Sequence, residues 1–334
     1  MNRTITTLCI LAASGLTAAA FPNKLLAKPA GWFRTDEGHQ AVAAVLSWQA
    51  PTGIWPKNED TTSKPFNGDR QKLQGTFDNG ATTDELRFLA RAFVATGDQH
   101  CEQAFLTGFD HILKAQYSNG GWPQYFPLSK QYHRHITFND ETMVRLLGLL
   151  REVATSDDLQ FVDAKRRQAA QAAFDRGIDC ILKCQIVVHG KPTVWCAQHD
   201  EVTLAPAAAR SYELPSLSGS ESAGILRLLM SLEHPSPAVI SAVKAGVAWF
   251  DAAQLKGIKI AKVDGDRKVV ADPKAPPLWA RFYEIETNQP FFCGRDGVKK
   301  PNLAEIEAER RNGYAWYGNW GEAVVKTYAK WPHR

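Results

Sequence analysis

Two short segments of the sequence place oxygen-donor side chains just before a helical pattern. Asp78 and Asn79 lie in FDNGATT, and Asp140 and Glu141 lie in FNDETM. Carboxylate and amide oxygens are the ligands that a hard cation such as calcium prefers. Asp and Asn are also common helix N-caps, so each pair by itself could serve only the following helix. Because FDN and FND recur at equivalent places, we expect one metal site assembled from separate loops.

Three arginines suggest a ligand that carries carboxylates. Arg210 lies in AARSY, Arg281 in WARFY and Arg295 in CGRDG, within two long segments that separate helical patterns. A single arginine is usually solvated or paired with an acid, but three in one cleft would suit a polycarboxylate, since guanidinium binds carboxylate with two parallel hydrogen bonds. Tyr212 and Tyr283 lie beside two of these arginines. Their rings could face sugar rings, although such aromatic residues more often cover a core.

Helices must position these groups, because apolar residues recur at helical spacing along most of the chain. In TTDELRFLARAFVATG, Thr82 and Glu85 form a capping-box pattern and Gly97 ends the helix. The remaining helices are expected before residue 49 and at about 100–116, 139–154, 164–185, 218–232, 237–254 and 321–331.

A repeat links these helices. Gln49, Gln116, Gln185 and Gln254 end every second helix, at steps of 67, 69 and 69 residues, and a turn with glycine and then a tryptophan follows the first three. Repetition at this period predicts stacked helical hairpins. A closed all-α toroid is the expected fold, although an open solenoid would leave similar traces. In a toroid, the inner helices all begin at one end, so the segments carrying the acids and arginines should converge there on one cleft.

Five long segments resemble the family 10 polysaccharide lyases, which are pectate lyases. The resemblance runs from about residue 32 to the C-terminus and rests on TFDNGATTDELRFLARAF, SNGGWPQYFP, ITFNDETMVRLLGLLREV, WCAQHDEVTLAPAAARSYELPSLSGSES and ARFYEIETNQPFFCGRDGVKK. It implies an (α/α)3-type toroid with long irregular inserts, anti β-elimination on α-1,4-linked polygalacturonate, and dependence on Ca2+.

The resemblance also implies a role for each candidate residue. Arg295 would abstract the C5 proton, Arg210 and Arg281 would bind substrate carboxylates with Tyr212 and Tyr283 beside them, and Asp78, Asn79, Asp140 and Glu141 would surround calcium. Arginine normally stays protonated because its pKa exceeds about 12. A role as base therefore requires calcium and neighbouring cations to lower the pKa of Arg295, which predicts an alkaline optimum.

The N-terminus predicts export. Arg3 precedes an apolar run that closes on Ala18, Ala19 and Ala20, a pattern typical of a signal peptide over residues 1–20. This run is too short to span a bilayer, so we expect a mature form at 21–334 that lacks a membrane span and is periplasmic or secreted. No linker divides this part, which predicts a single catalytic domain and a monomer.

Composition narrows the function further. The formal net charge of +4 gives no argument for nucleic acid as a partner. Removal of Cys9 with the signal peptide leaves five cysteines without framework spacing, so no disulfide scaffold is expected.

Three other functions remain open on the sequence. An α/α-toroid glycoside hydrolase would use carboxylates such as Asp140 and Glu141 as acid and base. A non-catalytic pectin-binding protein would bind galacturonate with its arginines but would not abstract a proton from it. The repeated glutamine, glycine and tryptophan pattern also occurs in triterpene cyclases, but the sequence lacks a DxDD-like proton donor. A lyase produces an unsaturated sugar that absorbs ultraviolet light, whereas the hydrolase and the pectin-binding protein do not.

Overall fold

The computed structural model describes residues 20–334, so the predicted signal peptide lies outside the described residues except for its last position. The helices agree with the sequence prediction to within a few residues at most ends. They are α1 (Asp36–Ser47), α2 (Thr83–Thr96), α3 (Gln99–Ala115), α4 (Thr142–Thr155), α5 (Ala164–Cys184), α6 (Glu221–Met230), α7 (Pro237–Ala252), α8 (Ala308–Gly313) and α9 (Trp320–Tyr328).

The glutamine repeat has a direct structural explanation. The Gln116 side-chain amide donates to the carbonyl of Gly120 in its own turn and to that of Ala173 in α5, at 3.0 and 2.8 Å. Gln49 and Gln185 make the equivalent pairs of bonds, which reach Ala104 in α3 and Ala242 in α7. Each glutamine therefore closes its own turn and joins one helical hairpin to the next.

The tryptophans of the repeat anchor the same turns. Trp55, Trp122 and Trp195 are fully buried. Each indole N–H donates to a carbonyl of the preceding long helix, that of Val45, Ile112 or Ile181, at 2.7 to 2.9 Å. Because a buried N–H without an acceptor would be costly, these bonds fix where each tryptophan can pack. The tryptophans of the repeat therefore belong to the scaffold of the helical row.

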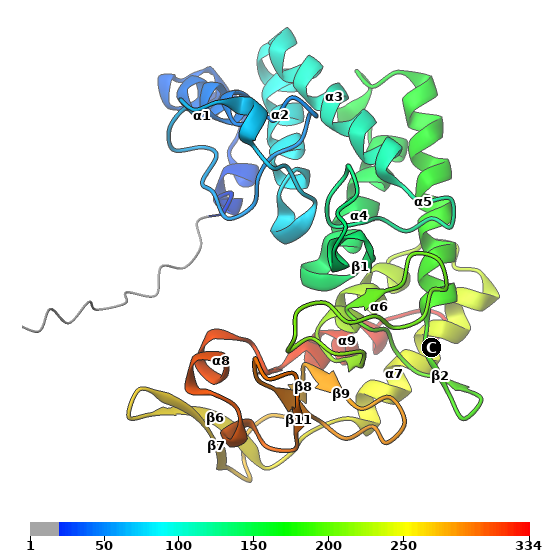
Figure 1. The fold of residues 1–334 in the computed structure, drawn as a ribbon. Helices are drawn as coiled ribbons and strands as arrows, with labels where there is room; N and C mark the ends of the chain where they lie inside the picture. The colour runs from blue at the N-terminus through cyan, green and yellow to red at the C-terminus, as the bar shows by residue number, and fades with distance from the viewer. Residues whose placement is uncertain (1–19) are drawn as a thin grey trace, which may run out of the picture.

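The expectation of an all-α, (α/α)3-type toroid is wrong. Helices α2 and α3 pack together, as do α4 with α5 and α6 with both α7 and α9, and each group packs on the next. Within residues 20–334, α1 to α3 make no substantial contact with α6, α7 or α9, so the row does not close. Figure 1 shows these two groups at opposite ends of the row. Periodicity in the sequence indicates contacts between neighbouring hairpins. Closure of the row into a toroid depends instead on a contact between its first and last helices.

Short strands also contradict an all-α chain. The long inserts and neighbouring loops form antiparallel pairs, and the longest of them joins two strands of six residues. The pairs are β1 (Ile136–Thr137) with β4 (Gln198–His199), β2 (Val187–Val188) with β3 (Lys191–Pro192), β5 (Leu217–Ser218) with β9 (Phe282–Tyr283), β6 (Ile258–Val263) with β7 (Asp266–Ala271), β8 (Trp279–Ala280) with β12 (Tyr317–Gly318), and β10 (Phe292–Cys293) with β11 (Lys299–Lys300). Most have two residues, which is too short for a periodic signal in the sequence.

Two hydrophobic clusters support the chain. The larger runs through the helical row, and a smaller one packs under the inserts around Tyr212, Phe282, Phe292 and Trp316. The smaller cluster carries the segments that contain the three candidate arginines, and it includes Cys293. The site described below therefore lies where the helical row meets a second small core.

Two further features concern the cysteines and the hydropathy of the helices. Within residues 20–334, the five cysteines after Cys9 are all buried and free. No helix in this part of the chain is both long and apolar enough to cross a bilayer.

Glu85 gives a first prediction, on pH and stability. Its carboxylate accepts the Thr82 N–H at 2.8 Å in the predicted capping box and the Thr61 hydroxyl at 3.0 Å. Burial raises the pKa of Glu85 from 4.5 to about 8. The unfolded chain therefore loses this proton at lower pH than the folded protein, and stability should fall as pH rises from about 4.5 to about 8.

The measurement is the melting temperature across that pH range. Glu85→Gln keeps an acceptor and a donor in the capping box but removes the titration, so its melting temperature should fall less over the range. Equal slopes for the wild type and the variant would show that Glu85 does not cause the pH dependence.

Candidate active site

Two adjacent turns carry the four predicted metal ligands. The first, Asp78–Gly80, precedes α2, and the second, Asn139–Glu141, precedes α4; the two turns pack against each other. Asn79, Asp140 and Glu141 all have positive φ, between 50° and 61°. This conformation is strained for Glu141 above all, since Asn and Asp tolerate it better. Strained backbone of this kind concentrates at functional sites.

These side chains do not cap the helices that follow. Thr82 occupies the N-cap of α2, and Glu141 occupies that of α4 without a capping hydrogen bond from its side chain. The alternative that FDN and FND serve only as N-caps therefore loses its support. Asn79, Asp140 and Glu141 instead border a common cleft of about 680 Å³, together with Glu221 of α6.

Asp78 differs from its three neighbours. It is buried, and one carboxylate oxygen accepts from the Lys57 ammonium at 2.5 Å and from the Gln124 amide at 2.6 Å. The other oxygen is buried and has no hydrogen-bond donor in the part of the chain that the structure describes. Asp78 thus combines a structural ion pair with one free acceptor atom directly before Asn79.

Arg281 connects the acidic turns to the arginine-bearing inserts. It is almost fully buried, forms an ion pair with Glu221, and lies 3.4 Å from an Asp140 carboxylate oxygen. On its other side the guanidinium lies 4.8 Å from the ring centre of Tyr314. Burial by itself would lower the pKa of Arg281, but the charges of Glu221 and other neighbouring groups outweigh this and raise it. Arg281 is therefore a permanent cation.

Arg210 and Arg295 lie around the same pair of aromatic rings. Tyr212 and Tyr314 pack edge to face, 5.5 Å apart. Arg210 lies 4.9 Å from the Tyr212 ring and is held by Glu213, while Arg295 lies 5.9 Å from the same ring. The structure therefore brings the three predicted arginines, which are 71 and 14 residues apart in sequence, to one group.

The arginines differ in exposure and in partners. The side chain of Arg295 is 61% exposed, against 43% for Arg210 and 8% for Arg281. Hydrogen bonds from Arg295 to Glu309, at 3.0 and 3.1 Å, raise the pKa of Arg295. Arg295 is thus the arginine most open to a ligand, but in this arrangement it is protonated.

The family follows from the whole sequence together with this fold. A family model described as pectic acid lyase matches residues 49–325. The chain belongs to the pectic acid lyase family. A family 10 polysaccharide lyase from Cellvibrio cellulosa is 35% identical to this lyase, with a TM-score of 0.83 over 95% of this chain and 100% of that one.

A second solved structure supports the same family assignment. It is a single-residue mutant of the Cellvibrio cellulosa enzyme in complex with trigalacturonic acid, 34% identical with a TM-score of 0.82 over 94% of this chain and 100% of that chain. No curated protein matches the sequence of this pectic acid lyase.

Two predicted tyrosines have structural roles in this pectic acid lyase. Tyr283 is almost fully buried, its hydroxyl donates to the Ala253 carbonyl, and the Ala280 N–H donates to it. Its ring offers no surface to a sugar, because it belongs to the core beneath β9. Tyr212 is also buried, at 4% exposure, and supports the arginines rather than presenting an open ring face.

Some residues of the site were not assigned to it from the sequence. Lys57 reaches Asp78, Glu221 holds Arg281, and Arg310 lies 4.5 Å from the Tyr212 ring. Ser218 and Glu221 have the spacing of a capping box, and the Ser218 hydroxyl donates to the Glu221 carboxylate. Arg310, in ERRNG, looks like any charged position of a surface helix. Only their tertiary neighbours distinguish these residues.

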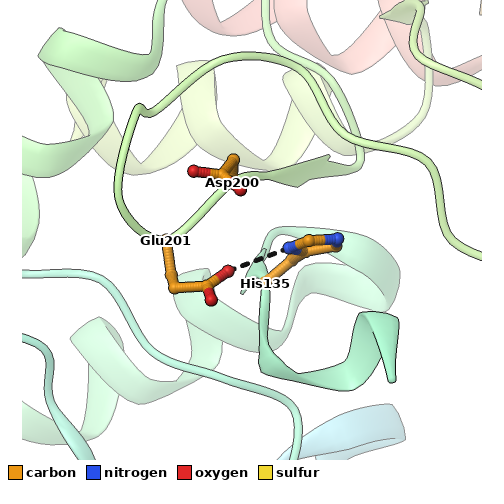
Figure 2. Close-up of side chains that lie close together, drawn as sticks. All are labelled: His135, Asp200 and Glu201. Atoms are coloured by element: carbon orange, nitrogen blue, oxygen red, sulfur yellow. Dashed lines mark hydrogen bonds and ion pairs between the residues drawn. The ribbon is translucent and has the colours of Figure 1, made fainter. Parts of the chain in front are cut away.

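His135 gains acidic neighbours that the sequence did not reveal. Because β1 pairs with β4, His135 lies across from Asp200, and Glu201 follows in the turn, as Figure 2 shows. One Glu201 oxygen is paired with Arg134 and the other lies 3.0 Å from the His135 ring. Asp200 accepts the Val202 and Thr203 amide N–H groups. With these donors in place, the cluster is explained as a local ion-pair network.

Proposed function

We propose that this protein is an exported pectate lyase that cleaves α-1,4-linked polygalacturonate by calcium-dependent anti β-elimination. One observation carries the proposal: Arg281 contacts Asp140 on one side and the tyrosine and arginine group on the other. A uronate carboxylate placed beside Arg281 would therefore meet both the oxygen-donor turns and the cationic group. The binding of trigalacturonic acid by the related Cellvibrio cellulosa enzyme supports the same class of substrate.

The arginines match the charges that this reaction develops. In a 4-linked galacturonide, the C5 proton is α to the C6 carboxylate, and its removal places negative charge on that carboxylate before the C4–O bond breaks. Arg281 and Arg210 are fixed by ion pairs, so they would stabilise this charge without reorganising. Arg295 would accept the proton after its guanidinium leaves Glu309 and loses its own proton.

The acidic turns fit calcium by their chemistry. Asn79, Asp140 and Glu141 border the cleft and each carries a side-chain oxygen, and Asp78 has a buried oxygen without a donor among residues 20–334. No hydrogen bond or ion pair occupies the Glu141 carboxylate within the described residues. Calcium bound there would neutralise the substrate carboxylate and make the C5 proton more acidic.

The decisive experiment is an absorbance assay on polygalacturonate at alkaline pH. We expect an ultraviolet-absorbing unsaturated product with calcium and none with excess chelator. New reducing ends without absorbance would indicate hydrolysis instead, and binding without either product would indicate a pectin-binding protein.

The calcium ligands give a second prediction. Asp140→Asn should raise the calcium concentration needed for half-maximal activity by about tenfold or more, because it removes a charged ligand while keeping its size. Asp157→Asn is the matched control, since this exposed acid lies beyond the other end of α4. An unchanged calcium requirement in Asp140→Asn would remove Asp140 from the metal site.

Export and oligomeric state complete the proposal. We expect the signal peptide 1–20 to be removed, the single catalytic domain 21–334 to reach the periplasm or the medium, and the enzyme to be a monomer. Mass spectrometry of the exported protein should find Phe21 at its N-terminus, and light scattering should report the mass of one chain.

A further inference from the structure

Another hollow, of about 500 Å³, adjoins the catalytic cleft, because Asn58 in its wall accepts from the Asn79 amide of the cleft at 3.3 Å. We call it the distal pocket and define it by Trp48, Lys57, Glu59, Phe66, Lys72 and Tyr125. Trp48 and Phe66 pack against each other at 4.7 Å, and the Trp48 indole N–H donates to the Lys64 carbonyl at 3.0 Å. The loop after α1 therefore holds two aromatic side chains in fixed positions at this wall.

Side chains connect the distal pocket to the proposed catalytic groups. Lys57 borders the pocket and donates to Asp78, the neighbour of Asn79. On the other side, Tyr125 packs on His133 at 5.0 Å, and His133 stacks on Tyr132 at 3.9 Å.

This row of rings is partly open to solvent. Tyr125, Tyr132 and His133 are all half-buried. Burial lowers the pKa of His133, the positive charges of Lys57 and Arg210 lower it further, and the Asp78 carboxylate raises it. A path of partly exposed rings thus extends from the distal pocket to Tyr132.

The composition of the distal pocket suits a uronic acid. Lys72 is exposed and forms no ion pair with a carboxylate within residues 20–334, so its ammonium is available to an anion. Partly exposed aromatic side chains provide apolar surface for a sugar ring. Glu59 and Gln74 also line the pocket, and their side-chain oxygens can accept hydrogen bonds from sugar hydroxyls.

We infer that the distal pocket is an additional subsite, which binds a galacturonate unit of the same polysaccharide several residues from the bond that is cleaved. This inference rests on the proposed function, because it takes the substrate class from the catalytic site. A chain long enough to occupy both the arginine group and the distal pocket would bind more tightly than one that occupies the arginine group alone. In this proposal the pocket gives the enzyme a preference for long chains over trigalacturonate.

The test measures binding separately from turnover. Isothermal titration calorimetry is carried out in the Arg295→Ala background, with polygalacturonate and with trigalacturonate as ligands. Lys72→Ala removes the free cation, Lys72→Arg keeps it, and Phe66→Ala removes one ring that is not part of the main core. Lys268→Ala, an exposed lysine of the β6 and β7 hairpin, is the matched control.

Lys72→Ala should weaken binding of polygalacturonate about three- to fivefold, as expected for loss of one partly exposed ion pair, and leave trigalacturonate binding unchanged. Lys72→Arg should restore affinity, Phe66→Ala should weaken it, and Lys268→Ala should have no effect. Equal losses for both ligands, or no loss in Lys72→Ala, would overturn the distal subsite.

Activity measured with Arg295 intact distinguishes the proposed lyase function from the distal subsite. Lyase activity with no effect of Lys72→Ala on polygalacturonate binding would leave the proposed function intact and reject the subsite. Lys72-dependent binding of polygalacturonate without any unsaturated product would reject the lyase and keep the subsite. A wild type that does not bind polygalacturonate would overturn both.

Discussion

Arg295→Ala is expected to lower kcat on polygalacturonate by about 10²- to 10⁴-fold, the usual contribution of a positioned base. The affinity for the polysaccharide should change much less, because Arg210 and Arg281 would still bind carboxylates. Arg295 is exposed, and among residues 20–334 its ion pair is with the exposed Glu309 alone, so the melting temperature should stay the same. The measurements are steady-state absorbance kinetics and thermal unfolding of the same preparation.

Arg151→Ala is a matched control, since this half-buried arginine donates to the Ser231 hydroxyl at the far end of α4. It should leave kcat unchanged. If Arg295→Ala keeps most of the calcium-dependent activity, Arg295 is not the base.

Glu309 allows a finer check on the same role. Its hydrogen bonds raise the pKa of Arg295, so Glu309→Gln should lower that pKa and favour the neutral form. A base acts when deprotonated, so the rising limb of the pH–rate profile should move to lower pH. No movement of that limb would mean that the titrating group is not Arg295.

Arg281→Ala is expected to damage both stability and activity. The substitution leaves Glu221, which is 2% exposed, without its cationic partner. Breaking a buried ion pair from one side typically costs about 3 to 5 kcal/mol of the free energy of unfolding. Activity should fall as well, because the cation between Asp140 and Tyr314 is lost. Denaturant unfolding and the absorbance assay measure the two effects.

A double variant separates these two roles of Arg281. Arg281→Met with Glu221→Gln removes both charges, so much of the lost stability should return while activity stays low. Recovery of activity together with stability would show that Arg281 serves only the fold. Loss of stability in the double variant as large as in Arg281→Ala would mean that the ion pair is not the source of the damage.

The helices and their repeat were predictable from the sequence because their causes are local or periodic. The apolar spacing places α2, α4 and α5, and the capping box of Thr82 and Glu85 is present as expected. The recurrence of glutamine every 67 or 69 residues reflects one bond geometry used three times. Gln254, the last glutamine of the repeat, donates to the Asp251 carboxylate instead.

The candidate site was predictable in its residue types but not in its partners. Motif resemblance selected Asp140, Arg210, Arg281 and Arg295, and the structure brings them into one neighbourhood. It could not show that Lys57 already pairs with Asp78, nor that Tyr283 is buried in the core. Such facts depend on contacts between segments that are far apart in the sequence.

The sequence by itself determined the family, the helical repeat and the acid and arginine residues from which an active site can be built. Only the tertiary structure decided that the helical row stays open, that the inserts form short antiparallel pairs around a second core, and that Glu221 holds Arg281. The physical reason is the range of the forces involved. Periodicity and capping act over one or two turns of a helix, whereas ring closure, strand pairing and buried ion pairs arise only when distant segments pack together.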